Sequence, residues 1–169
     1  EQALALQSDN FAALHNLGNA YYALERYDTA LEFYEKMYQL NPNSYNAILN
    51  IAGCCYNLKQ YIRAIEFASM AIEKRPTSPE PYIISGNSYI ELSKNNEATG
   101  CLKKAAEIAP SSDWLCQSIA NLFQKMGNWK QCLHYAWKSI VLKGQAVSID
   151  DQINFAYFLY EVLEETGDK

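Results

Sequence analysis

The stretch from Pro42 to Pro76 reads PNSYNAILNIAGCCYNLKQYIRAIEFASMAIEKRP, and it decides the fold. Its two terminal prolines lie 34 residues apart, and Pro110 follows after another 34. Between the prolines, apolar residues recur three and four apart in two runs separated by the polar pair Lys59-Gln60. This spacing predicts two amphipathic helices joined by a tight turn. Because proline cannot donate a helical hydrogen bond, each proline is expected to follow the end of a second helix.

The same 34-residue period extends over the rest of the chain. One series places small residues in the first helix, another places them in the second helix, and a third places bulky residues at the turn. These series are Gly18, Ala52, Gly86 and Ala120; Ala30, Ala64, Ala98 and Cys132; and Tyr27, Tyr61 and Trp129, with Asn95 breaking the third. Small residues let two helices approach closely, and a larger side chain there would cost roughly 1–3 kcal/mol.

Together these residues resemble the tetratricopeptide repeat family, which has this period and this pattern of small, aromatic and proline positions. The resemblance places repeats at 11–44, 45–78, 79–112 and 113–146, after a preceding repeat's helix tail at 1–10 and before a further or capping repeat's first helix at 147–169. The chain departs from the family at Cys55, Cys132 and Gly144, where tyrosine, alanine and proline are usual. We therefore expect an all-α, right-handed superhelical solenoid of antiparallel helix-turn-helix repeats, cut from a longer array.

In this family the first helices line a concave groove, and asparagine recurs there in the present chain. An amide side chain both donates and accepts hydrogen bonds, so it can pair with a peptide main chain. Tyrosine and tryptophan could add apolar anchors. The alternative is that these amides bond only to the neighbouring repeat or to solvent. Facing positions carried over from the family also include Asn57 and Glu91. The candidate peptide-binding residues are His15, Asn16, Asn19, Tyr22, Asn50, Tyr56, Asn87, Trp114 and Asn121.

One known groove chemistry is not expected here. Family members that grip the carboxylate terminus of heat-shock chaperones need two basic groove residues. His15, Asn19 and Asn50 occupy three of the matching positions, but Glu80 and Ile84 occupy the two that should be basic. Since neither an acidic nor an apolar side chain can neutralise a carboxylate, this clamp is predicted to be absent.

Composition argues against several other classes of protein. The formal net charge of −5 and the lack of basic clusters disfavour nucleic-acid binding. Residues 37–58 are uncharged, but they contain Pro42 and five asparagines, so membrane insertion is not expected. Phosphate loops and hydrolase or metalloprotease motifs are missing, and the five cysteines show no metal-ligand spacing. We expect no enzyme activity, no metal and no cofactor, and core cysteines in a reducing, cytoplasmic compartment.

The leading hypothesis is a non-catalytic scaffold that binds an extended peptide or partner segment in its groove, as part of a multiprotein assembly. One alternative is a dedicated chaperone of a type III-like secretion system, because residues 79–81 read Pro-Glu-Pro as in the small chaperones of that class. Another is a regulatory or targeting domain of a larger enzyme. Self-association through the unpaired C-terminal helix is a further expectation, since Ile153, Phe155, Leu159 and Leu163 would lack their cover.

Overall fold

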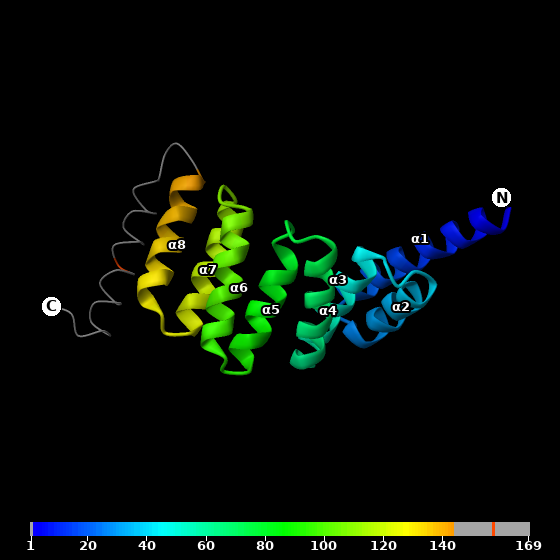
Figure 1. Ribbon diagram of the computed structural model, residues 1–169, viewed down its shortest axis with the longest axis horizontal. Helices are drawn as coiled ribbons and strands as arrows, with labels where there is room; N and C mark the ends of the chain where they lie inside the picture. Colours follow the sequence, from blue (N-terminus) through cyan, green and yellow to red (C-terminus); the bar gives the residue numbers. More distant parts are fainter. Residues whose placement is uncertain (1, 144–156, 158–169) are drawn as a thin grey trace. The chain divides into compact units, whose positions relative to one another are not determined.

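The computed structural model describes residues 2–143 and residue 157 of the chain (Figure 1). Within these residues there are helices and no strands, which confirms the predicted all-α class. The helix predicted over 147–169, with Ile153, Phe155, Leu159 and Leu163, lies outside the described residues apart from Tyr157. The helices are α1 (Gln2–Ala23), α2 (Tyr27–Leu40), α3 (Tyr45–Asn57), α4 (Tyr61–Lys74), α5 (Glu80–Glu91), α6 (Asn95–Ile108), α7 (Asp113–Lys125) and α8 (Trp129–Leu142).

The chain divides into two compact units, residues 1–101 and 102–169, and each is described by itself. In the first unit α1 packs on α2 and α3 packs on α4, which gives two helical hairpins. Further packing of α2 against α3, and of α5 against both α3 and α4, joins these hairpins into one stack. In the second unit α7 and α8 form another hairpin. The prediction of stacked helical hairpins is therefore confirmed within the first unit.

Prolines end the second helices as the sequence predicts. α2 ends at Leu40 and α4 at Lys74, each two residues before a proline. Two of the first helices, α3 and α7, are preceded by capping serines that lie 68 residues apart, which is two repeat periods, whereas α5 is preceded by Pro79 and has no side-chain cap. The hydroxyl oxygen of Ser44 accepts from the Ala47 N–H of α3, and Ser112 accepts from the Leu115 N–H of α7, both at 3.3 Å. A serine at this position satisfies one of the amides that a helix leaves unbonded at its start.

Each turn inside a hairpin contains one residue in the left-handed backbone conformation, which the sequence does not predict. Glu25, Lys59, Ser93 and Gly127 have φ values of 57°, 60°, 57° and 66° and lie at 34-residue intervals. After α3, the N–H of Lys59 donates to the Tyr56 carbonyl and that of the next residue to the Cys55 carbonyl. This is the Schellman arrangement, which usually places glycine at the left-handed position. Only the fourth turn has one.

The small residues of the hairpins allow the close packing that the sequence predicts. Gly18 of α1 lies against the ring of Tyr34 on α2, which is 1% exposed. A Cβ atom at Gly18 would come within 2.5 Å of the Tyr34 Cε1 atom. Around this contact lie buried residues of both hairpins, namely Ala30, Met37, Ala47, Ile51, Cys54, Cys55 and Ala64.

α1 differs from the expected boundary at its start. Residues 1–10 are expected to be the tail of a separate preceding helix, yet α1 runs from Gln2 to Ala23 without a break. Residues 2–17 contain neither proline nor glycine, so nothing in the sequence stops a helix at residue 10. The other repeat boundaries remain predictions.

Candidate functional site

The ends of α1 and α3 meet at a polar contact on the first-helix side of the first unit. The Nδ2 atom of Asn57 donates to the Tyr22 hydroxyl oxygen and to the Gly53 carbonyl, both at 2.9 Å. The Tyr22 ring also lies over Gly53, whose Cβ position would be 3.6 Å from the hydroxyl oxygen. Tyr22 is 37% exposed, so this contact is open to solvent. Burial raises the pKa of Tyr22, while the bond to Asn57 partly offsets that rise.

The equivalent positions one repeat further on lie at the ends of α3 and α5 and at the start of α4. Tyr56 and Tyr61 occupy the positions 34 residues after Tyr22 and Tyr27, and Glu91 takes the position of Asn57. The rings of Tyr56 and Tyr61 have centroids 6.0 Å apart, and those of Tyr22 and Tyr27 are 5.1 Å apart. We call Tyr22, Gly53, Tyr56, Asn57 and Glu91 the first-helix face.

Glu91 carries the negative charge of this second contact. Its carboxylate is near enough for its charge to act on the phenols of both Tyr56 and Tyr61. Desolvation, followed by the charge of Glu91, raises the pKa of Tyr56 and of Tyr61. Both tyrosines therefore keep their protons at neutral pH.

Asn19, one of the asparagines that recur in the first helices, forms side-chain hydrogen bonds within its own hairpin. The Tyr34 hydroxyl donates to its Oδ1 atom at 2.7 Å. Its Nδ2 atom lies 3.4 Å from the Nε2 atom of His15, one turn earlier on α1. Asn19 thus supports a buried ring of its own repeat, a role that differs from the predicted alternative of a bond to the neighbouring repeat or to solvent.

The other predicted residues fall into two groups. Asn16 is exposed, and Asn50 and Asn87 are half-buried, with no side-chain hydrogen bond to another described residue. Trp114 and Asn121 lie on α7 in the second unit. There Trp114 is 64% exposed, and Asn121 accepts a hydrogen bond of 3.1 Å from Gln117.

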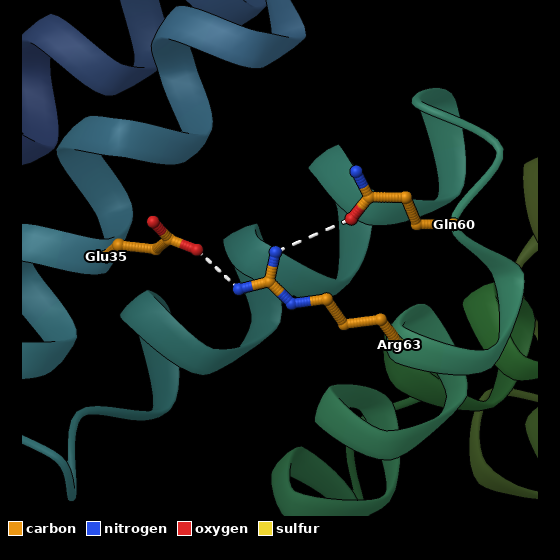
Figure 2. A network of polar contacts seen from close by, with 3 residues as sticks. All are labelled: Glu35, Gln60 and Arg63. Atoms are coloured by element: carbon orange, nitrogen blue, oxygen red, sulfur yellow. Dashed lines mark hydrogen bonds and ion pairs between the residues drawn. The ribbon is translucent and has the colours of Figure 1, made fainter.

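The second helices carry a separate polar network. Arg63 of α4 donates to Glu35 of α2 in an ion pair, and to the Gln60 side chain at 3.4 Å (Figure 2). Figure 2 shows the guanidinium lying between its two partners. Beside it, an open hollow of about 550 Å³ is lined by Lys59, Gln60, Tyr61, Ile62, Arg63, Glu66 and Leu92.

The cysteines belong to the core, as predicted. Cys54, Cys55, Cys116 and Cys132 are buried and Cys101 is partly buried, and all five are free thiols. Burial raises the pKa of each thiol, and that of Cys54 to about 12. A thiol in this state is a poor nucleophile. In the described part of the chain, no three His, Cys, Asp or Glu residues are placed to hold a metal ion together.

Known proteins with this arrangement identify the fold. A family model described as anaphase-promoting complex, cyclosome, subunit 3 matches residues 23–105, slightly less than half of the chain. The solved structure of MamA from Desulfovibrio magneticus RS-1 is similar at 20% identity and a TM-score of 0.69, over 79% of this chain and 75% of that one. The Arabidopsis OM64 TPR domain matches at 19% identity and a TM-score of 0.64, over 70% of this chain and 98% of that one. The chain has the tetratricopeptide-repeat fold.

A third similar structure is a tetratricopeptide-repeat domain with a ligand. It is the first such domain of Spaghetti (RPAP3), bound to the HSP90 peptide SRMEEVD. This chain matches it at 22% identity and a TM-score of 0.63, over 70% of this chain and 94% of that one. No curated protein sequence matches the chain. Among the described helices of this tetratricopeptide-repeat chain, none combines the length and apolar character needed to cross a bilayer.

Three residues at these contacts are not among the candidate residues predicted from the sequence: Asn57, Tyr61 and Glu91. Asn57 and Glu91 fall at positions that the resemblance predicts to face the groove, but the candidate residues are chosen for the recurring asparagines and the aromatic anchors. Tyr61 belongs to the bulky series at the turn and is expected to be scaffold only. A signal does exist, because Tyr22 and Tyr27 recur together as Tyr56 and Tyr61 after 34 residues.

Proposed function

We propose that the chain is a non-catalytic scaffold that holds an extended segment of another protein against the first helices of its repeats. The observation that carries this proposal is the unused hydrogen-bonding capacity of Tyr22 and Asn57. The proposal also takes the repeat units at 11–44, 45–78, 79–112 and 113–146 as predicted, and within the first unit it draws on the contacts of α3 with α1 and with α5.

A count of donors and acceptors shows what the pair offers. Both amide hydrogens of Asn57 are used, one on the Gly53 carbonyl and one on the Tyr22 hydroxyl oxygen. The Oδ1 atom of Asn57 therefore keeps its lone pairs, and the hydrogen of the Tyr22 hydroxyl has no acceptor among the described residues. One donor and one acceptor lie side by side at a partly exposed position.

A peptide main chain presents the complementary pair. Every residue other than proline brings one N–H and one C=O, which must be satisfied when it leaves water. Asn57 can accept from the N–H, and Tyr22 can donate to the C=O, whatever side chain the residue carries. Asn50 and Asn87 have amides without partners among the described residues and extend the same chemistry along α3 and α5.

Two further observations support a binding role without catalysis. A domain of the same fold is known with a peptide bound, which supports an extended guest here as well. The buried thiols, whose pKa values are raised, favour the core rather than a reactive nucleophile. The ligand of that domain is acidic, however, and the first-helix face carries Glu91.

Selection from a library of random, unstructured peptides displayed on phage tests the proposal. We expect enrichment of a peptide whose affinity is then measured by fluorescence anisotropy. Either substitution, Tyr22→Phe or Asn57→Ala, removes one hydrogen bond to the peptide. Because such a bond contributes about 1 kcal/mol, each should weaken peptide binding about five- to tenfold.

Asn96→Ala is the matched control, because Asn96 is an exposed amide of α6 without a described side-chain partner. Circular dichroism of all variants checks that the fold is intact. If no peptide is enriched, or if Tyr22→Phe and Asn57→Ala bind the selected peptide as the control does, the proposal is wrong.

A further inference from the structure

The two equivalent contacts of the first-helix face differ in charge. At the first, the ring pair Tyr22 and Tyr27 is accompanied by the neutral amide of Asn57. At the second, the ring pair Tyr56 and Tyr61 is accompanied by the carboxylate of Glu91. The aromatic frame is thus repeated, while the polar group changes from a neutral donor to an anionic acceptor.

Among the described residues, none neutralises Glu91. It is exposed, and it forms no ion pair with any Lys or Arg of the described residues. A carboxylate has about four acceptor positions, and among the described residues no basic side chain occupies them in an ion pair.

We propose that Tyr56, Tyr61 and Glu91 form a subsite for a positively charged side chain, arginine or lysine, of the bound segment. This inference rests on the proposed function, because the cation is carried by the peptide held along the first helices. Aromatic rings attract a cation over their faces, and a carboxylate adds charge-assisted hydrogen bonds. The two rings are tilted by 52° and so present two differently oriented faces to one group.

Two basic side chains, Lys59 and Arg63, line the hollow next to Tyr61, and among the described residues neither forms an ion pair with Glu91. The guanidinium of Arg63 donates to Glu35 and to Gln60 (Figure 2). It is therefore held toward the second helices and does not compete for Glu91. The open hollow of about 550 Å³ beside Tyr61 leaves room for a long side chain to approach.

The same charge predicts which guests are rejected. A segment with an aspartate or glutamate at this place would bring a second carboxylate to Glu91, and like charges repel. The chain is thus expected to select basic segments, and its specificity is expected to lie in the second contact. The first contact, at Tyr22 and Asn57, is expected to bind only the main chain of the peptide.

Parallel peptide selections with the native chain and with Glu91→Gln test the subsite. The native chain should enrich Arg or Lys at one fixed position of its peptides, and Glu91→Gln should still enrich peptides but lose that basic position. Glu73→Gln removes the same charge from an exposed site on α4 and serves as the matched control, which should keep the basic position.

The outcomes separate this inference from the proposed function. Enrichment without a basic position, or an unchanged basic position with Glu91→Gln, overturns the subsite and leaves the peptide-binding face in place. Failure to enrich any peptide overturns both.

A double-mutant cycle gives the second measurement. In one selected peptide, replacing the basic residue by glutamine should weaken binding to the native chain about tenfold. The same replacement should change binding to Glu91→Gln by less than about twofold, because the partner charge is gone. Equal losses in both proteins would contradict the assignment.

Discussion

The hydroxyl of Tyr34 donates a hydrogen bond of 2.7 Å to the side-chain oxygen of Asn19. Tyr34 belongs to α2 and is almost fully buried, whereas Asn19 lies on the exposed side of α1. The polar end of a core ring is thus satisfied by an amide on the face where a peptide is expected. One lone pair of the Asn19 oxygen is already used, so substituting Asn19 changes stability as well as any binding.

The variant Asn19→Ala should therefore lower the free energy of unfolding by about 1–3 kcal/mol, because it leaves a buried hydroxyl without its acceptor. Tyr34→Phe removes that hydroxyl and should cost less, about 1 kcal/mol. In the double variant, the additional effect of Asn19→Ala should nearly vanish. Urea denaturation followed by circular dichroism measures all three. Additive losses would show that the bond contributes little.

Gly18→Ala should destabilise the chain although alanine is the better helix former. The new Cβ would overlap the Tyr34 ring, which is packed on all sides and tethered through its hydroxyl. Overpacking of this kind costs roughly 1–3 kcal/mol. Gly53→Ala is the control, since its Cβ would meet only ordinary contacts of 3.6 Å and more. That variant should gain up to about 1 kcal/mol from helix propensity. Equal effects in a thermal melt would contradict the contact.

Lys59→Gly should stabilise the second hairpin by about 0.5–1 kcal/mol. Lys59 has a φ of 60°, a conformation that is strained for residues with a Cβ and free for glycine. The fourth turn already has glycine there, so Gly127→Ala should cost about 1 kcal/mol; its Cβ would touch nothing within 4 Å. Denaturation midpoints measure both changes. A loss of stability in Lys59→Gly would show that the side chain contributes more than the strain.

The conformation of these turns could not be predicted from the sequence, whereas the hairpins could. The prolines, the small residues and the helical spacing predict the hairpins because each feature acts locally on one helix or one contact. The left-handed positions at Glu25, Lys59 and Ser93 carry no glycine, so only the 34-residue interval to Gly127 could have suggested them. The continuous start of α1 could not be predicted either, because the tail of a separate preceding repeat would have the same composition.

The candidate site was harder to predict, because its roles depend on contacts between helices. Asn19 and Asn57 are the same residue type on similar helices, yet one supports a core ring and the other meets Tyr22. The two asparagines lie at different positions of the repeat, since Gly53 is the counterpart of Asn19, and Tyr34, which bonds Asn19, is replaced by Ala68 one repeat later. A periodic pattern cannot reveal a contact that occurs in one repeat only.

Raising the pH should weaken the fold through Cys54. Burial raises the pKa of its thiol from the ordinary 9.0 to about 12 in the folded chain. The stabilisation is complete below pH 9.0, where both states hold the proton, and it is lost as pH rises toward 12 because only the unfolded state ionises. The loss is at most about 1.4 kcal/mol for each unit between the two pKa values.

The Cys54→Ala variant isolates this effect from the tyrosines, which also titrate at high pH. Its stability should fall less steeply than that of the native chain between pH 9.0 and 12. Urea denaturation at a series of pH values measures the difference. Parallel curves for the two proteins would mean that Cys54 ionises in the folded chain as easily as in the unfolded one.

The acidic peptide SRMEEVD, which the similar RPAP3 domain binds, should not bind this chain. Glu80 stands where a basic residue would be needed, and its carboxylate accepts a 2.7 Å hydrogen bond from Ser78 at the start of α5. Ile84, at the other such position, packs against the core. Both positions therefore lack the positive charge that a terminal carboxylate requires.

Fluorescence anisotropy with labelled SRMEEVD measures this, using the RPAP3 domain as the positive control. We expect no saturation of the native chain at concentrations that saturate the control. The variant Glu80→Lys replaces a repelling charge with an attracting one, so it should gain measurable affinity if the remaining groove residues are correctly placed. Tight binding by the native chain would mean that other groups neutralise the carboxylate. It would also weaken the inference that Glu91 makes this face selective for basic segments, because the same surface would then accept an acidic guest.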